Sequence, residues 1–403
     1  MRDNGLHTPD GFRDYLAGEY AFKKRTEDGL EAVFQRYAYS SVCTPTLEYA
    51  EVFTDKGSVD PKQMYRFIDR DGEMLALRAD LTPSVARVVA TNFGPEDTPL
   101  RFCYVQNVFR YSPNYQGRLR EITQAGIELT GPSGDEADAE VLAVAIDALR
   151  SSGLEDFRID VGQVRFLQGM LETCGLAPAV CDELRDFVVA RDFVAAEAVG
   201  REHDAPLDMR RLLSNLPFFN GEAEILDEAL EEAKNEKSRA AVVNLKNIHA
   251  TLKDYGFEKY VSFDLSMAGN MDYYTGIIFR GYTSGLGFSI LDGGRYDGLV
   301  ARFGVDLPSV GFIIKVHNLV GALEKQNRQA PDGEADVLVA WTPEGRRFAL
   351  ASAAALRRDG LRCANSLAVG DAAANLRDAR RRGIPRVLWF DGTCASGVTL
   401  WTD

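Results

Sequence analysis

Two short segments combine an acid, tyrosines and glycines in a way that suits a small polar pocket. The first is Asp272-Tyr273-Tyr274-Thr275-Gly276, and the second is Gly293-Gly294-Arg295-Tyr296-Asp297-Gly298-Leu299. Glycines allow the backbone to approach a ligand closely, while a carboxylate and phenol hydroxyls supply hydrogen bonds. Both segments adjoin strand-like apolar runs, which predicts a polar pocket floored by an antiparallel sheet. Taken alone, such segments fit a Gly-rich β-hairpin equally well.

Asp80 and Thr82 form a second polar group, where a predicted strand over residues 74–78 gives way to a helix that runs to about Asn92. Pro83 is typical of the first turn of a helix, which places Thr82 near the helix N-terminus. A carboxylate at such a junction either binds a ligand or caps the helix. The sequence alone leaves both roles open for Asp80.

Arg110, Gln124 and Glu128 lie on a predicted pair of antiparallel strands, over residues 101–111 and 124–129. Gln124 and Glu128 are an even number of residues apart, so their side chains face the same side of the strand. Arg110 carries a rigid guanidinium that suits bidentate binding of an anion. Ordinary strand polarity is the alternative explanation for Gln124 and Glu128.

The composition is that of an ordinary globular protein, long enough for two or three domains. Of the 403 residues, 45% are apolar and 26% are charged. No run of about 18 or more apolar residues is present to span a membrane, and the N-terminus lacks the apolar core of a secretion signal. The six cysteines have no Cys-x-x-Cys spacing. We therefore expect a cytoplasmic protein with reduced thiols, and neither a disulfide framework nor a zinc site.

The formal net charge of −14 is unevenly distributed along the chain. Residues 331–403 hold ten Arg and nine Asp or Glu and so carry +1, which leaves −15 on residues 1–330. A protein that grips tRNA needs a basic face to neutralise phosphates. The charge balance therefore counts against a nucleic-acid partner, although a local basic patch is compatible with it.

Hydrophobic periodicity and its breaks divide the chain into two predicted domains. An amphipathic helix is predicted from about Gly18 to Tyr37, and residues 166–255 are typical of a charged helical insertion. A polar linker over residues 324–334 precedes the alternating strands and helices of a small α/β domain. We therefore predict one domain over residues 1–326 and a second over residues 334–403.

Five separated motifs resemble those of the histidyl-tRNA synthetase family, one of the class II aminoacyl-tRNA synthetase families, and occur in the same order. Besides the two segments above, they are a helix and strand with Pro45, the strands and loop from Phe109 to Gln124, and the strand and helix from Pro308 to Leu319. The resemblance implies an α+β fold in which helices flank an antiparallel sheet. It also implies an anticodon-binding-like α/β domain at the C-terminus and a homodimer formed through the Pro45 segment.

The same resemblance implies roles for individual side chains. In the family, the acid at the position of Asp80 binds the ammonium group of the substrate, and the arginine at the position of Arg110 holds the α-phosphate of ATP. An acid and an amide at Glu128 and Gln124 suit the imidazole and amino group of histidine. The histidine-binding residues expected from the resemblance are Asp80, Thr82, Arg110, Gln124, Glu128, Asp272, Tyr273 and Tyr274.

The chain departs from the synthetase pattern where that family carries out ATP chemistry. Gly269 and Asn318 stand in place of arginines, and Ser112-Pro113-Asn114-Tyr115 replaces the loop sequence Glu-Arg-Pro-Gln. Loss of one preorganised donor typically costs about a hundredfold or more in rate. We therefore predict a protein without catalytic residues, cofactor or metal, which binds histidine without activating it.

A histidine pocket without ATP chemistry resembles the regulatory-subunit family of ATP phosphoribosyltransferase, a paralogue of the synthetase. The resemblance implies activation of a short-form catalytic subunit, in a hetero-octamer of four plus four chains, and feedback inhibition by L-histidine. Histidine can change activity only if it binds two assembly states with different affinity. Two alternatives remain open: a working histidyl-tRNA synthetase with replacement cations, and a free-standing histidine-sensing or RNA-binding module.

Overall fold

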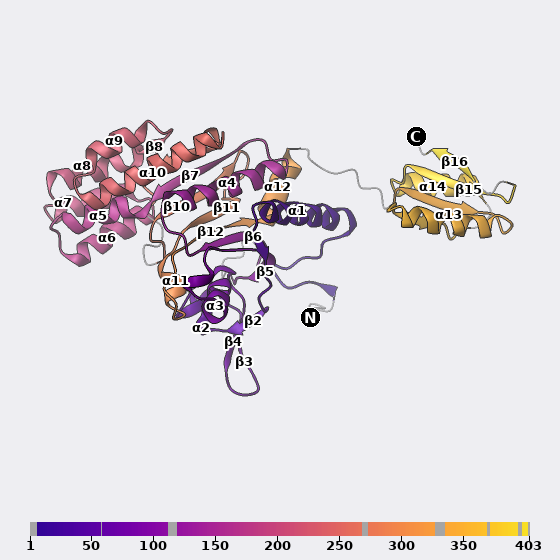
Figure 1. The fold of residues 1–403 in the computed structure, drawn as a ribbon, viewed down its shortest axis with the longest axis horizontal. Helices are drawn as coiled ribbons and strands as arrows, with labels where there is room; N and C mark the ends of the chain where they lie inside the picture. Colours follow the sequence, from indigo (N-terminus) through magenta and orange to yellow (C-terminus); the bar gives the residue numbers. More distant parts are fainter. Residues whose placement is uncertain are drawn as a thin grey trace. The chain divides into compact units, whose positions relative to one another are not determined.

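The computed structural model describes residues 6–57, 59–111, 119–267, 273–326, 335–368, 371–393 and 397–401. The chain divides into a large unit that contains Lys23–Arg328 and a small unit that contains Gln329–Asp403 (Figure 1). Each unit has its own sheet and its own buried core.

A nine-stranded sheet forms the centre of the large unit, in the order β1-β5-β6-β12-β11-β10-β7-β9-β8. The pairings from β5 through β7 are antiparallel, whereas β1 joins β5 and β9 joins β7 in parallel. The strands are Ser40–Ser41 (β1), Leu100–Phe109 (β5), Glu121–Thr130 (β6), Phe157–Gln163 (β7), Asn220–Gly221 (β8), Val261–Asp264 (β9), Ile277–Thr283 (β10), Leu291–Arg295 (β11) and Ser309–Lys315 (β12). The predicted α+β class, with a largely antiparallel sheet, is confirmed.

Helices cover both faces of this sheet. On one face, α3 and α11 share a core cluster with β5, in which Val85, Tyr104 and Leu299 are buried. On the other face, α4 and α12 contact β6 (Figure 1). These helices and their neighbours are Ala17–Arg36 (α1), Glu51–Thr54 (α2), Thr82–Asn92 (α3), Asp135–Ser151 (α4), Gly298–Ala301 (α11) and Val316–Lys325 (α12). The amphipathic helix expected near residue 18 is α1, which differs from the prediction by one residue at each end.

The chain between β7 and β9 is almost entirely helical. Its helices are Val164–Thr173 (α5), Pro178–Val189 (α6), Phe193–Glu202 (α7), Leu207–Asn215 (α8), Ile225–Glu232 (α9) and Glu236–Asp254 (α10). Prolines mark the breaks, because Pro178 is the first residue of α6 and Pro206 immediately precedes α8. We call this segment the helical insertion.

A second, three-stranded sheet of the large unit has the order β2-β4-β3 and comprises Leu47–Tyr49 (β2), Arg66–Ile68 (β3) and Met74–Leu77 (β4). Pro45 lies between β1 and β2, which belong to different sheets, so the proline ends one strand before the next begins. The side chains of Leu47, Tyr49 and Phe67 lie on one face of this sheet and are 45%, 53% and 42% exposed.

The small unit has a four-stranded sheet in the order β14-β13-β15-β16. The first three strands are parallel, and β16 pairs antiparallel with β15. Its elements are Val337–Trp341 (β13), Arg346–Arg358 (α13), Cys363–Asn365 (β14), Ala372–Arg381 (α14), Arg386–Phe390 (β15) and Val398–Trp401 (β16). Its likeness to an anticodon-binding domain stays a prediction. Among the described residues of both units, no helix is long and apolar enough to cross a membrane.

Candidate functional site

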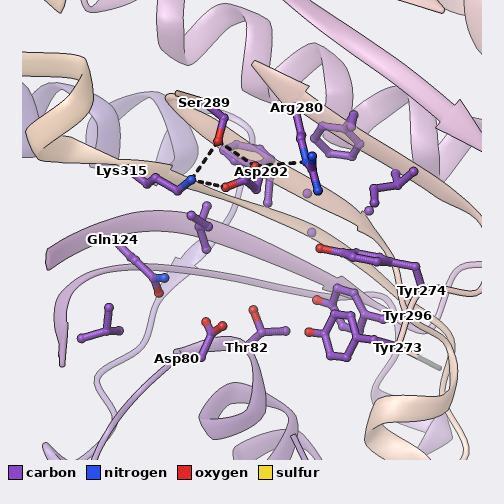
Figure 2. A pocket seen from close by; sticks show the side chains of 18 of the residues that line it. Asp80, Thr82, Gln124, Tyr273, Tyr274, Arg280, Ser289, Asp292, Tyr296 and Lys315 are labelled. Carbon is purple, nitrogen blue, oxygen red and sulfur yellow. Dashed lines mark hydrogen bonds and ion pairs between the residues drawn. The ribbon is translucent and has the colours of Figure 1, made fainter. Parts of the chain in front are cut away.

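A cavity of about 540 Å³ lies on the face of the large sheet that α3 covers (Figure 2). Strands β6, β12, β11 and β10 form its floor. The register of these strands brings their polar side chains together, because Gln124 lies opposite Lys315 and Asp292 lies opposite Arg280. Alternate residues of neighbouring strands therefore point into one space.

Glycines of β11 and β12 make room on this floor for side chains of the protein itself. A Cβ atom on Gly294 would lie 2.6 Å from the ring of Tyr274, and one on Gly311 would lie 2.0 Å from Glu128 Oε2. Both distances are far below a normal carbon contact. Gly294, expected from the sequence to let the backbone approach a ligand, therefore makes room for Tyr274, and Gly311 makes room for Glu128.

Tyr273, Tyr274 and Tyr296, together with Asp80 and Thr82, form what we call the tyrosine end of the cavity. The ring centroid of Tyr273 lies 4.9 Å from that of Tyr274, at right angles, and 5.6 Å from that of Tyr296, stacked. Burial raises the pKa of Tyr273 and Tyr274, so both phenols are neutral. The Tyr274 hydroxyl has no hydrogen-bond partner among the described residues and points into the cavity (Figure 2).

Asp80 is held by an arginine from the strand beside it. Arg110 Nη2 donates to Asp80 Oδ2 at 2.5 Å, and Arg110 Nε donates to the carbonyl of Ala79 at 2.8 Å. Helix α3 has no side-chain cap, and Asp80 Oδ1 accepts only from the adjacent Leu81 N–H. Asp80 therefore does not cap the helix, and its role in ligand binding stays a prediction.

Gln124 and Glu128 face the same side of β6, but only Gln124 lines the cavity. Gln124 Oε1 is buried and has no hydrogen-bond partner in the described part of the chain. Glu128 lies on the same face but is covered by Tyr104 and Tyr296, whose hydroxyls donate to its two carboxylate oxygens, Tyr104 at 2.8 Å. Burial raises the pKa of Glu128 to about 8. We expected Glu128 to contact the imidazole directly. Such a contact requires Tyr104 or Tyr296 to move away from the carboxylate.

The remaining predicted histidine-binding residues divide into two groups. Thr82, Arg110, Tyr273 and Tyr274 all line the cavity, as do Asp80 and Gln124. Asp272 lies outside the described residues, as do Gly269 and residues 112–118, which contain the departing loop.

The opposite end of the cavity, which we call the lysine end, holds four polar side chains that sequence reasoning did not assign to the site. Lys315 Nζ forms an ion pair with Asp292 and donates to Ser289 Oγ at 2.8 Å (Figure 2). Ser289 Oγ also donates to Asp292 Oδ1 at 2.9 Å, and Arg280 Nε lies 3.7 Å from the same carboxylate oxygen. The period of two along β10, β11 and β12 was the signal for Arg280, Asp292 and Lys315, because each faces the side of the sheet that carries Gln124. Ser289 precedes β11 and carried no such signal.

Asn318 and His317, at the start of α12, do not line the cavity. Asn318 is 8% exposed and donates to the carbonyl of Ser289 at 2.8 Å, so it supports the wall from behind. Burial, with Lys315 nearby, lowers the pKa of His317 to about 4, so this imidazole is neutral. A structural role for His317, the interpretation that the sequence favoured over a catalytic base, fits this position.

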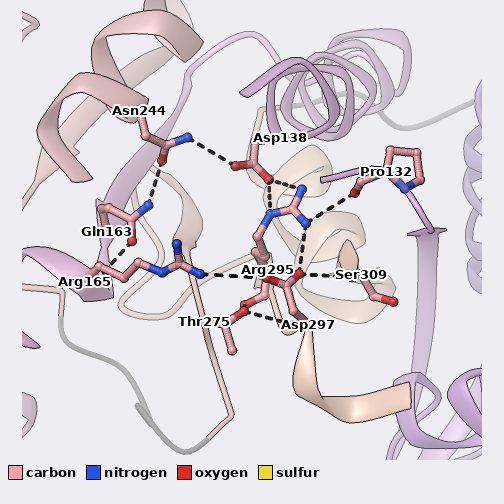
Figure 3. A network of polar contacts seen from close by, with 9 residues as sticks. All are labelled: Pro132, Asp138, Gln163, Arg165, Asn244, Thr275, Arg295, Asp297 and Ser309. Atoms are coloured by element: carbon pink, nitrogen blue, oxygen red, sulfur yellow. Dashed lines mark hydrogen bonds and ion pairs between the residues drawn. The ribbon is translucent and has the colours of Figure 1, made fainter. Parts of the chain in front are cut away.

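Arg295 holds the chain beside the tyrosine end (Figure 3). Its guanidinium donates to Asp138 at 2.8 Å and to Asp297 at 3.0 Å, and the side chains of Arg295 and Asp138 are only 6% and 3% exposed. Thr275 N donates to the Arg295 carbonyl at 2.8 Å, and Asp297 N donates to Thr275 Oγ1 at 2.9 Å. Burial raises the pKa of Asp138 to about 6. These bonds hold Thr275, the residue that follows Tyr274, in place.

The same polar network reaches the helical insertion. Asn244 of α10 lies between Asp138 and Gln163, accepting from Gln163 Nε2 at 2.7 Å and directing its amide to Asp138 at 3.5 Å (Figure 3). Gln163 in turn caps α5 by accepting from Arg165 N at 3.2 Å. Side chains from the sheet, α4 and α10 therefore share one buried network.

Comparison with known sequences agrees with this geometry. Residues 11–319 match the family described as histidyl-tRNA synthetase. Over 389 residues the chain is 39% identical to an ATP phosphoribosyltransferase regulatory subunit of Acetivibrio thermocellus, an alignment that covers 96% of this chain and 93% of the relative. It is also 40% identical over 355 residues to a protein of the same name from Thermoanaerobacter sp. (strain X514), covering 88% and 93%.

Solved structures give a similar result. A Bacillus halodurans protein described as an ATP phosphoribosyltransferase regulatory subunit/histidyl-tRNA synthetase is 29% identical, with a TM-score of 0.85 and coverage of 96% of this chain and 99% of that one. Histidyl-tRNA synthetase from Nostoc sp. PCC 7120 has a TM-score of 0.84 at 21% identity, with coverage of 98% and 96%. The second likeness concerns the fold alone.

Proposed function

Because the chain belongs to the family of ATP phosphoribosyltransferase regulatory subunits, which share the histidyl-tRNA synthetase fold, we propose that it activates a short-form catalytic subunit of that enzyme in the first step of histidine biosynthesis. We further propose that L-histidine binds in the cavity and mediates feedback inhibition. One observation carries this proposal. The cavity gathers side chains suited to an amino acid at its tyrosine end, whereas at its lysine end both cations, Lys315 and Arg280, face the carboxylate of Asp292.

The cavity offers each polar group of histidine a partner of the right kind. Asp80 supplies a carboxylate for the ammonium group, and Arg110 beside it supplies a guanidinium for the carboxylate. The unpartnered Oε1 of Gln124 accepts from an imidazole N–H, and the free Tyr274 hydroxyl donates to the other ring nitrogen. A buried acceptor without a partner costs free energy in the empty protein, which binding would recover.

We propose that the chain is not itself a catalyst. Formation of an adenylate needs fixed positive charge beside the phosphates. The cations that line the lysine end, Arg280 and Lys315, are both directed to Asp292, and Asn318 is neutral and buried. An ATP–pyrophosphate exchange assay with histidine tests this point, and exchange above background would favour a histidyl-tRNA synthetase instead.

We propose that the chain forms a homodimer through the region that contains Pro45, and that four such chains join four catalytic subunits in a hetero-octamer. The exposed apolar face of the three-stranded sheet supports the homodimer. Leu47, Tyr49 and Phe67 lie side by side on this face, and burial of such a patch against a second copy stabilises an oligomer. Sedimentation of the chain alone and with its partner tests both assemblies.

The decisive experiment mixes the purified chain with a short-form catalytic subunit and follows phosphoribosyl-ATP formation with and without histidine. We expect activation on mixing and inhibition by histidine. The Asp80→Asn variant should still activate but should lose inhibition at histidine concentrations that inhibit the wild type, because the ammonium partner is gone. Asp292→Asn, at the other end of the cavity, is the matched control and should behave as wild type. No change in rate in any mixture would exclude the proposal.

Recovery of partners from cell extract separates this proposal from a free-standing sensor or RNA-binding module. A regulatory subunit should recover the short-form catalytic chain in stoichiometric amounts. Recovery of RNA without any catalytic chain would instead favour the module.

A further inference from the structure

We propose that Cys174 and Cys181 form a reversible disulfide site in the helical insertion. This site lies away from the cavity, and the proposal does not depend on the proposed function. Both residues are free thiols in this structure. Their spacing of seven residues matches no familiar cysteine motif, so the site was not predicted from the sequence.

The fold brings the two sulfurs together across the turn between α5 and α6. Cys174 is the residue immediately after α5, and Cys181 lies in the first turn of α6, which begins at Pro178. The two Sγ atoms are 3.7 Å apart. A disulfide bond is about 2.05 Å long. The two sulfurs must therefore approach each other by about 1.7 Å to form the bond.

Both thiols also contact the same backbone carbonyl, which holds them on one side of the turn. Cys174 Sγ donates to Leu171 O at 3.0 Å, and Cys181 Sγ approaches the same oxygen at 3.5 Å. The Leu171 carbonyl is a weak acceptor for thiols, so it keeps the two sulfurs close together without fixing either of them strongly. Among the described cysteines, the others are Cys43, Cys103 and Cys363, and none of them has a sulfur in contact with another sulfur.

The two thiols differ in solvent exposure, and this difference decides which of them reacts first. Cys174 is 9% exposed, whereas Cys181 is partly exposed and lines a surface depression together with Leu176 and Arg185. An oxidant in solution therefore reaches Cys181 first. Burial and the neighbouring Cys174 raise the pKa of Cys181 to about 11, so little thiolate exists at neutral pH and oxidation is slow. Because its oxidation is slow, such a thiol stays reduced during brief oxidation and is oxidised only under a sustained oxidising condition.

The oxidant is a low-molecular-weight disulfide such as oxidised glutathione, and the exchange has two steps. The Cys181 thiolate attacks one sulfur of the oxidant, forming a mixed disulfide and releasing one small thiolate, which takes up a proton. The Cys174 thiolate then attacks the Cys181 sulfur and releases the second small thiol. Two protein thiols are oxidised to one disulfide, and one small disulfide is reduced to two thiols.

The test equilibrates the full-length chain in glutathione redox buffers, quenches with acid, and locates the linkage by peptide mapping and intact mass. We expect a Cys174–Cys181 link whose midpoint in the folded chain is shifted by at least about tenfold in the glutathione ratio relative to the chain in concentrated urea, or about 30 mV. The folded geometry, rather than closeness in sequence, is responsible for such a shift. Equal midpoints in both conditions would overturn the proposal.

Single substitutions give an independent reading. Cys174→Ser should accumulate glutathione on Cys181, because the resolving thiol is missing, whereas Cys181→Ser should leave the buried Cys174 unmodified. Cys43→Ser removes an exposed thiol elsewhere and should leave the link unchanged. If Cys43 of the wild type is glutathionylated while Cys174 and Cys181 remain reduced and unlinked, the proposal is wrong.

Discussion

The two ends of the cavity differ in how their polar groups are satisfied. At the tyrosine end, the Tyr274 hydroxyl has no hydrogen-bond partner among the described residues. At the lysine end, Lys315, Asp292 and Ser289 form a closed set of contacts with one another. Unused hydrogen-bonding capacity in a cavity favours a ligand, whereas a self-satisfied cluster behaves as a wall. The difference supports the proposal that histidine binds at the tyrosine end.

Removal of Arg295 should have the largest effect, because this side chain supports the tyrosine end and is buried against Asp138. Arg295→Met would leave the Asp138 carboxylate buried without its cation. We expect the free energy of unfolding of the large unit to fall by about 3–5 kcal/mol, measured by urea titration with far-ultraviolet circular dichroism. The double variant with Asp138→Asn should recover part of this loss.

The chain contains internal and matched controls for that experiment. All three tryptophans, Trp341, Trp389 and Trp401, lie in the small unit, so the urea midpoint of tryptophan fluorescence should not move. Arg280→Met makes the same substitution at the lysine end. Arg280 is 44% exposed and 3.7 Å from Asp292, so we expect a loss below about 0.5 kcal/mol. Equal losses for the two arginine variants would contradict the contrast between the ends.

The affinity for histidine should distinguish the two ends next most clearly. Asp80→Asn removes the negative charge that we assign to the ammonium group, at a cost of about 2–3 kcal/mol, or about fiftyfold in Kd. Asp292→Asn removes a carboxylate of similar exposure at the lysine end and should change Kd by less than about threefold. Isothermal titration of both variants measures this. A greater loss for Asp292→Asn would move the histidine site to the lysine end.

Part of this site was predictable from the sequence because it depends on local rules. Alternation along β6 places Gln124 and Glu128 on one face, and the proline after Thr82 marks the start of α3. These rules act over a few residues. That Asp80, Thr82, Tyr273 and Tyr274 belong to one site was implied by the resemblance to the synthetase family. The antiparallel sheet and flanking helices followed from the order of motifs.

The rest depends on contacts between distant segments. The pairing of Asp292 with Lys315 requires the register of β11 against β12, which no local pattern specifies. Glu128 was expected to contact the ligand, yet Tyr104 and Tyr296 reach it from β5 and from the end of β11 and occupy both its oxygens. The sequence predicted the face of β6 on which Glu128 lies, but not that its carboxylate is buried beneath two tyrosines.

The lysine end should tolerate loss of a charge at moderate cost to stability. Lys315→Met leaves Asp292 with Ser289 and Arg280, and the side chains of Lys315 and Asp292 are each 28% exposed. We expect a loss of about 1–2 kcal/mol in the free energy of unfolding and a change below about twofold in Kd for histidine. A double-mutant cycle with Asp292→Asn gives the coupling of the pair. A large fall in histidine affinity would show that the two ends are not independent.

The smallest effect we expect is a dependence on pH that arises at the tyrosine end. Burial raises the pKa of Glu128 from 4.5 to about 8 in the folded protein, so the folded state keeps a proton that the unfolded state loses above pH 4.5. The stability from this proton is complete below pH 4.5 and is lost as pH rises through about 8. Glu128→Gln, which is neutral at every pH, should therefore flatten the stability profile between pH 5 and 8.

Glu140→Gln provides a control of opposite sign for this titration. A hydrogen bond from Arg101 lowers the pKa of Glu140, so its contribution to stability is present above the unfolded pKa and is lost only as pH falls below it. The difference between wild type and this variant should then stay constant from pH 5 to 8, whereas the difference for Glu128→Gln should change steadily across the same range. Urea titrations at each pH measure both differences. Parallel profiles for the two variants would mean that Glu128 is ionised beneath the tyrosines, and the tyrosine end would then carry a negative charge that could meet an imidazolium.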